Sequence, residues 1–354
     1  METNNPIPAS QSDLEQRLQQ AIDACHTAER RYLQSSRRAR LLGGFGFALV
    51  VGMLSLSALK PVGAQSGSGP TLSSLQQEIN GLQAQINKVI QKTWFMSANG
   101  DTKTTTFSGC NVVIQSGSGS TDDGVSHGST LTGLGNLIIG YDAAGNIYGD
   151  LRTGSHNLIL GDRNSYSSYG GLIAGYYNTI SAPYASVSGG LLNEAKGIYA
   201  SVSGGYDSAA IGVCSSVSGG DNNLAIGDYA SVSGGQYNTA SGQWSSVSGG
   251  GQFNTASGSL SSVSGGYSNT ASGDYASVSG GTDNTASGIY SSVCGGAFNR
   301  SVVNYASILG GYGGYAYGNF SVICGGQYNA AGGDYSANLG GNGINVPTQF
   351  GHNP

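Results

Sequence analysis

Charged side chains are scarce in this sequence of 354 residues, and their scarcity excludes several classes of protein. Asp, Glu, Lys and Arg make up 9% of the chain, and the formal net charge is −5. From residue 101 on, basic residues are few, which argues against nucleic acid as a partner because phosphate binding needs clustered Lys and Arg. The 4 His and 5 Cys are scattered, so no metal site or cofactor is predicted.

The sequence also lacks the clusters of side chains that catalysis needs. No His falls in an evident Ser–His–Asp arrangement. We therefore predict that the protein is not an enzyme. A polysaccharide lyase or hydrolase on a β-helix is the alternative, and it requires clustered carboxylates. The candidates, which form no cluster in sequence, are Asp207, Asp221, Asp228, Asp274 and Asp283.

The N-terminal region contains two apolar patterns before residue 65. Residues 12–34 have a helical apolar stripe, which predicts a helix within a cytoplasmic segment, 1–40. Residues 41–59 carry no charge and are long enough to cross a bilayer, so 41–64 is predicted to be a signal anchor or a cleaved signal peptide. The basic residues before this segment predict that the rest lies outside the cytoplasm, membrane-anchored, secreted or at the cell surface.

A second group of patterns lies between this segment and the repeats. Residues 65–71 read as a flexible linker. Over 72–92, Leu, Ile and Val recur in steps of three and four, which predicts a coiled-coil stalk; one amphipathic helix packed on its own chain is the alternative. Residues 93–135 contain TTTFSG and NVVIQSG, which predict short strands in a β connector.

A repeat of about 15 residues is the strongest pattern in the sequence, and it extends over 136–341. One clear copy is YASVSGGQYNTASG (229–242), and Gly251 lengthens a single step by one residue. So short a unit buries its apolar side only by stacking on its neighbours. We therefore predict an all-β repeat solenoid, followed by a C-terminal tail at 342–354.

The two-residue period of a β-strand assigns the side chains of each copy to faces. Ala230 and Val232 are predicted to point into the coil, and Ser233 outward. In the second strand, Asn238 and Ala240 are predicted to point inward. An inward Asn at a corner can bond the turn backbone and the Asn of the neighbouring rung.

Two outward columns are candidate contact surfaces. The column of Ser233 accepts apolar residues, which predicts burial against another chain; scattered surface apolar residues are the alternative. The predicted trimer face comprises Ile138, Ile159, Ile173, Cys294, Leu309, Cys324 and Leu339. The second column is aromatic and is predicted either to stack along the rod or to contact a host protein or glycan. Its members are Tyr184, Tyr199, Tyr229, Trp244, Tyr275, Tyr290, Tyr305, Phe320 and Tyr335.

A Thr-x-Ser ladder offers a different function. Regular hydroxyl columns are typical of ice-binding or other surface-binding solenoids, which is the alternative to a structural rod. The ladder consists of Thr239/Ser241, Thr255/Ser257, Thr270/Ser272 and Thr285/Ser287.

The repeats resemble the head repeats of YadA-type trimeric autotransporter adhesins. NLIIG (136–140), NLILG (157–161) and SVSGG followed by N-x-A-S-G carry the resemblance. It implies a left-handed parallel β-roll, three chains side by side, surface exposure and adhesion. The C-terminal GINVPTQFGHNP does not match the family's C-terminal membrane anchor, and the stalk precedes the head. The prediction is a homotrimeric structural or adhesive rod, exported or at the cell surface.

Overall fold

The structure, a computed structural model, describes residues 72–353. The chain divides into two compact units after Val113, and each is described by itself. The described part of the first unit holds one helix, α3 (Leu72–Thr93), and an antiparallel pair of strands, β1 (Met96–Asn99) and β2 (Thr104–Phe107). The segments predicted at 1–40, 41–64 and 65–71 lie outside the described residues.

The predicted fold class was wrong about residues 72–353, where one helix precedes the solenoid and there is neither a membrane segment nor a pair of packed helices. Within residues 72–353, α3 is the one α-helix, and no helix there is long and apolar enough to span a bilayer. Along α3, Ile79, Ile86 and Val89 are 48%, 37% and 50% exposed, so no other part of residues 72–353 covers the stripe that suggested a coiled coil. The described architecture is a parallel solenoid preceded by a single helix.

The connector contains less strand than its sequence suggests. TTTF forms β2, whereas residues 111–117 form no strand. The second unit begins there, with a short 3-10 helix, η1 (Val125–His127), ahead of the first solenoid strand.

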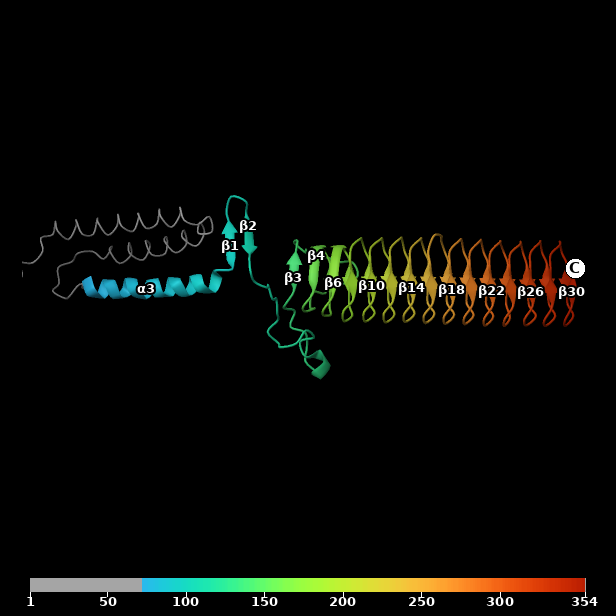
Figure 1. Ribbon diagram of the computed structural model, residues 1–354, viewed down its shortest axis with the longest axis horizontal. Helices are drawn as coiled ribbons and strands as arrows, with labels where there is room; N and C mark the ends of the chain where they lie inside the picture. The colour runs from blue at the N-terminus through green and yellow to red at the C-terminus, as the bar shows by residue number, and fades with distance from the viewer. Residues whose placement is uncertain (1–71, 354) are drawn as a thin grey trace, which may run out of the picture. The chain divides into compact units, whose positions relative to one another are not determined.

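The second unit is built from two long parallel sheets, with strands that alternate between them along the chain (Figure 1). The 15-stranded sheet, called the Ser sheet here, comprises β3 (Leu137–Ile139), β4 (Leu158–Asp162), β6 (Leu172–Tyr176), β8 (Ser186–Val187), β10 (Ser201–Val202), β12 (Ser216–Val217), β14 (Ser231–Val232), β16 (Ser246–Val247), β18 (Ser262–Val263), β20 (Ser277–Val278), β22 (Ser292–Val293), β24 (Ser307–Ile308), β26 (Val322–Ile323), β28 (Ala337–Asn338) and β30 (His352–Asn353). The 13-stranded sheet, called the Thr sheet, comprises β5 (Ser165–Tyr166), β7 (Thr179–Ile180), β9 (Glu194–Ala195), β11 (Ala209–Ala210), β13 (Leu224–Ala225), β15 (Thr239–Ala240), β17 (Thr255–Ala256), β19 (Thr270–Ala271), β21 (Thr285–Ala286), β23 (Arg300–Ser301), β25 (Tyr315–Ala316), β27 (Ala330–Ala331) and β29 (Asn345–Val346).

Each rung stacks on the next in strict register, as the repeat predicts. Val232 pairs with Val247, and Ala240 pairs with Ala256 across the step that Gly251 lengthens. The backbone N–H of Ser231 donates to the carbonyl of Ser245 on the next rung at 3.0 Å. This pattern continues into β29 and β30, so the solenoid includes residues that were predicted to form a tail.

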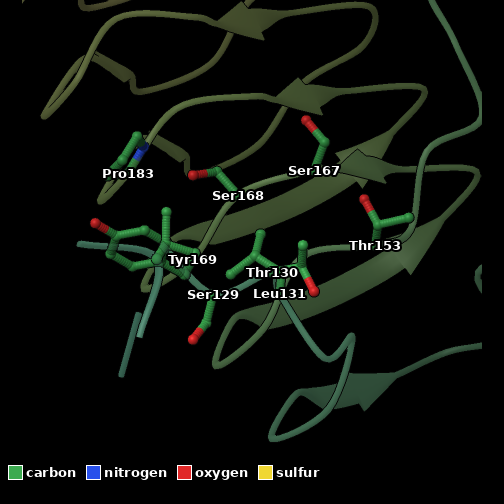
Figure 2. A pocket seen from close by; sticks show the side chains of 9 residues that line it. Ser129, Thr130, Leu131, Thr153, Ser167, Ser168, Tyr169 and Pro183 are labelled. Atoms are coloured by element: carbon green, nitrogen blue, oxygen red, sulfur yellow. The ribbon is translucent and has the colours of Figure 1, made fainter. Parts of the chain in front are cut away.

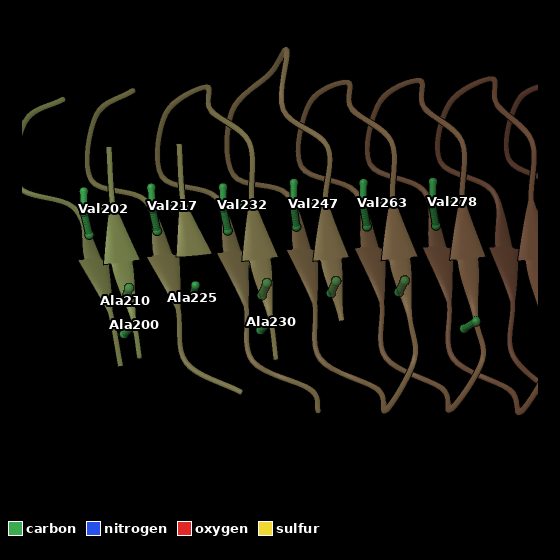
Figure 3. Packing of buried hydrophobic residues seen from close by; sticks show 14 of the residues in the cluster. Ala200, Val202, Ala210, Val217, Ala225, Ala230, Val232, Val247, Val263 and Val278 are labelled. Carbon is green, nitrogen blue, oxygen red and sulfur yellow. The ribbon is translucent and has the colours of Figure 1, made fainter. Parts of the chain in front are cut away.

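The core is a narrow column of small and β-branched side chains between the two sheets (Figure 3). Val202 and Val247 are 0% exposed, and so are Ala200 and Ala240. The predicted inward direction of the Val and Ala columns is therefore confirmed. Because a Val–Ala core fills little volume, the two sheets lie close together and each rung depends on its neighbours for burial.

The inward Asn column also forms as predicted. Asn269 is 0% exposed, and its side-chain nitrogen donates to the carbonyls of Gly265 at 3.0 Å and Gly281 at 2.9 Å. Its side-chain oxygen accepts the backbone N–H of Asn284 on the next rung at 3.0 Å. Asn269 thus satisfies a turn in its own rung and joins it to the next rung, and its backbone N–H donates to the side-chain oxygen of Asn254 on the rung before at 3.1 Å.

The prediction that Ile138, Ile159 and Ile173 belong to the trimer face was wrong, because the alignment of these early copies was shifted by one residue. Ile159 pairs with Ile173, which pairs with Val187, so these isoleucines belong to the core column. Ile159 and Ile173 are 0% exposed. Ile138 pairs with Ile159 and shares that column, although it is 46% exposed at the first strand. The outward column contains the residue that follows each of them.

Candidate functional site

The predicted aromatic column lies on the turn that leads into each Ser-sheet strand, and it forms a ladder of half-exposed rings. Phe350, which the sequence analysis missed, continues it. From Tyr275 to Phe350 each ring stacks on the next, with centroids 4.5–5.3 Å apart. Cys214 and Leu260 interrupt the ladder, as their sequence positions predict. The exposed fraction of each ring lies between 43% and 69% for Tyr184, Tyr199, Tyr229, Trp244, Tyr275, Tyr290, Tyr305, Phe320, Tyr335 and Phe350.

These aromatic residues adopt a backbone conformation that bulky side chains seldom take. Tyr290 has φ 58° and Trp244 has φ 54°. The left-handed region costs a non-glycine residue about 1–2 kcal/mol. A stacked pair contributes about 0.5–1.5 kcal/mol beyond its buried area, which offsets this cost. The rings therefore stack along the rod, as one of the two alternatives predicted, while contact with a protein or glycan stays a prediction.

The opposite turn carries a second aromatic column that the sequence analysis did not identify. Tyr237 and Phe253 stack with centroids 5.2 Å apart, and both have positive φ. Asp207, Asp283 and other polar residues occupy the same position in other rungs, so the column is not evident as an aromatic pattern. The column could have been found from the sequence by aligning the residue that directly precedes each inward Asn, where Tyr or Phe recurs in several rungs.

The outward face of the Ser sheet is free of charge over most of its length. Its two outward columns are serine through the middle rungs, as at Ser231 and Ser233. Towards the C-terminus the second column becomes apolar: Leu309 and Leu339 are each 54% exposed, Cys294 is exposed and Cys324 is half-buried. The structure therefore places these four predicted trimer-face residues together, on one surface.

The outward face of the Thr sheet carries the predicted hydroxyl ladder. Thr239, Thr255, Thr270 and Thr285 pair in register. Leu224 precedes this run and Arg300 follows it in the same column, so the ladder ends after four rungs. The ladder exists, and the ice-binding role that it suggested stays a prediction.

The carboxylates of the repeats are divided between the two turns. Asp228 and Asp274 each accept a backbone N–H from the rung before, at 2.9 Å. At the other turn Asp207 accepts the hydroxyl of Tyr148 at 2.6 Å, and this hydrogen bond raises the pKa of Tyr148 to about 12. The structure gives these carboxylates roles in the turns and does not bring the two sets together. That the protein is not an enzyme stays a prediction.

A depression of 510 Å³ lies where residues 125–131 pass beside the first rungs (Figure 2). Hydroxyl side chains from both segments line it, together with one tyrosine, one proline and two apolar side chains. The lining residues are Val125, Ser129, Thr130, Leu131, Thr153, Ser167, Ser168, Tyr169 and Pro183. Sequence analysis had no signal for this site, because it is formed by a segment without repeats.

A buried carboxylate anchors the segment that forms one wall of this depression. Asp123 accepts hydrogen bonds from the hydroxyls of Ser116 and Ser118 and from both the backbone and the hydroxyl of Thr132. Burial by itself raises the pKa of Asp123, but these hydrogen bonds outweigh it, and the net effect holds the pKa well below its usual value of 3.8. The ionised form is thus stabilised by the fold.

Acid is therefore expected to loosen this segment. Because the pKa of Asp123 is lower in the folded state, its contribution to stability is present above the unfolded-state pKa near 3.8 and is lost as the pH falls towards the folded value. The protection factor of the Thr132 amide against hydrogen exchange, which corrects for the slower intrinsic exchange in acid, should fall below about pH 4. Asp123→Asn should lower this protection factor already at pH 7, and should flatten its pH dependence. An equal loss of protection in Asp122→Asn, at the more exposed neighbouring carboxylate, would contradict this account.

Comparisons with known proteins do not assign the chain to a family, because no family model and no curated sequence matches it. Within residues 72–353, no group of three or more His, Cys, Asp or Glu side chains is placed to hold a metal ion. The candidate surfaces are thus the aromatic ladder, the two sheet faces and the depression.

Proposed function

We propose that this protein is a structural rod outside the cytoplasm, exported or at the cell surface, in which three copies associate through the outward face of the Ser sheet. The observation that carries this proposal is the absence of charged side chains from that face between β6 and β28. A long, flat face without charge carries no like-charge repulsion that would oppose its association with another copy.

The area of the face and its small side chains suit contact with another copy of the chain. The twelve strands from β6 to β28, about 4.8 Å apart, give a charge-free face about 55 Å long. With a width of about three residues, roughly 10 Å, its area is roughly 500 Å² per chain, of the same order as the 800 Å² or so per partner of stable interfaces. Serine side chains are small, and Leu309 and Leu339 add apolar area at one end. Another sheet with the same strand spacing matches this face along its whole length.

A row of glycines beside the face supports close approach. The first glycine of the Gly–Gly pair recurs in successive rungs, and at Gly189, Gly204, Gly295, Gly310 and Gly325 an added Cβ would meet nothing within 4 Å. Nothing inside the chain therefore requires glycine at these positions. An approaching chain supplies a reason, because a backbone without side chains lets a neighbour come close.

The number of copies and the adhesive role are supported by the resemblance to adhesin head repeats. Three chains side by side are what that resemblance implies. The aromatic ladder lies on a turn and not on the Ser-sheet face, so it is free to contact a host protein or glycan in this arrangement.

Light scattering of residues 72–354 tests the association. The expected solution mass is three times that of one chain. The triple variant Ser218→Glu/Ser233→Glu/Ser248→Glu is expected to have the mass of one chain, because carboxylates buried between like faces are repelled and desolvated.

The matched control places three carboxylates on the other sheet. Thr239→Glu/Thr255→Glu/Thr270→Glu creates the same repulsion within a chain but lies on the Thr-sheet face, so the assembly is expected to persist. A single-chain mass for the unmodified protein, or equal dissociation by both triple variants, would refute association through the Ser sheet.

A further inference from the structure

We infer that the depression beside the first rungs is a binding site for a neutral saccharide. This inference goes beyond the association of chains and does not depend on it. The site lies at the N-terminal end of the aromatic ladder, where residues 125–131 cover one side of the coil (Figure 2).

The hydroxyl groups of the site are available to a ligand. Within the described residues, no hydrogen bond engages the side-chain hydroxyls of Thr130, Thr153 or Ser167. A hydroxyl can both donate and accept, which matches the hydroxyl groups of a sugar in either sense. Several such groups around one depression can therefore replace the water molecules that surround a sugar.

Tyr169 supplies the apolar surface that sugar recognition also needs. Its ring meets Tyr184 edge to face, with centroids 5.3 Å apart and planes at 83°, whereas Tyr184 and Tyr199 stack in parallel at 5°. Tyr169 is thus turned out of the ladder, and no parallel ring from residues 72–353 stacks on it. Its ring, with the nearby Pro183, offers a platform for the C–H face of a pyranose.

The charge of the site selects against ionic ligands. No Lys, Arg, Asp or Glu is among the nine lining residues, so no fixed charge binds an anion or a cation. Burial, Tyr184 and the carboxylate of Asp122 together raise the pKa of the Tyr169 phenol. The negative charge of Asp122 therefore acts on the site and disfavours acidic sugars. The volume of 510 Å³ lies within the range of about 300–1,000 Å³ found for small-molecule sites.

Saturation-transfer NMR on the full chain tests the inference. The neutral probes are the methyl glycosides of glucose, galactose, mannose and N-acetylglucosamine, and the acidic probes are sialic acid and glucuronic acid. At least one neutral probe is expected to receive saturation, and the acidic probes are not. Tyr169→Ala is expected to weaken binding at least tenfold and Thr153→Val several-fold.

Two further variants separate binding from folding. Tyr169→Phe keeps the ring and is expected to retain binding, which shows that loss in Tyr169→Ala comes from the platform. Tyr335→Ala removes a ring far along the ladder and is expected to leave binding unchanged. The inference is overturned if no neutral probe binds, if acidic probes bind as well as neutral ones, or if binding survives both Tyr169→Ala and Thr153→Val. None of these outcomes depends on the number of chains in the assembly.

Discussion

Replacing Asn269 with leucine is expected to destabilise the solenoid by about 3 kcal/mol or more. The side chain is fully buried, and leucine leaves the carbonyl of Gly265 and the N–H of Asn284 without their partners. The carbonyl of Gly281 keeps one hydrogen bond, from the backbone of Tyr267 at 2.9 Å. Each unsatisfied buried group costs about 1–3 kcal/mol, and leucine restores none of them.

Urea unfolding monitored by circular dichroism measures this loss. Thr270→Leu, at the neighbouring outward position, is the matched control and is expected to change stability by less than about 0.5 kcal/mol. Asn269→Ser should lie between the two, because the native ladder already contains Ser208, whose hydroxyl accepts the N–H of Asn223 at 3.2 Å. Equal losses for Asn269→Leu and Thr270→Leu would show that the ladder contributes little.

Gly296→Ala is expected to be about as severe, at roughly 3 kcal/mol or more, and its neighbour Gly295→Ala nearly neutral. Gly296 has φ 82°, and an added Cβ would lie 2.1 Å from the carbonyl oxygen of Gly311 and 2.7 Å from the side-chain nitrogen of Asn299. The backbone conformation and the next rung both exclude it. At Gly295 an added Cβ would meet nothing within 4 Å, and its φ lies outside the left-handed region.

The same unfolding measurement compares the two alanines, which differ by one position in a single Gly–Gly pair. It should be made at a protein concentration where the chains are separate, since association is proposed to bring another chain near Gly295. Similar losses from both variants would mean that the second glycine is not held by the rung above it.

Much of the fold could be predicted from the sequence because the repeat imposes the same geometry on every rung. The inward direction of Val232, Ala240 and Asn238 follows from the two-residue period, and the structure confirms it. The columns of the later rungs align without ambiguity because their Gly–Gly turns have the same length. The aromatic ladder is visible in the sequence for the same reason.

The errors lie where the repeat changes or is absent. Ile159 and Ile173 were assigned to the outward column because the early turns are one residue shorter, and a shift of one residue reverses the face of a strand. For residues 72–92, apolar periodicity alone did not distinguish a coiled coil from the single exposed helix α3, because both have the same pattern.

The sequence by itself determined the parallel solenoid, its core columns and the Asn ladder, because each depends on contacts between equivalent positions of neighbouring rungs. Only the tertiary structure decided the left-handed backbone of residues such as Tyr290, the freedom of Gly295 beside the constraint on Gly296, and the depression next to Tyr169. These depend on backbone torsion, on atomic clearance and on a contact between a segment without repeats and the coil. None of the three has a periodic signature.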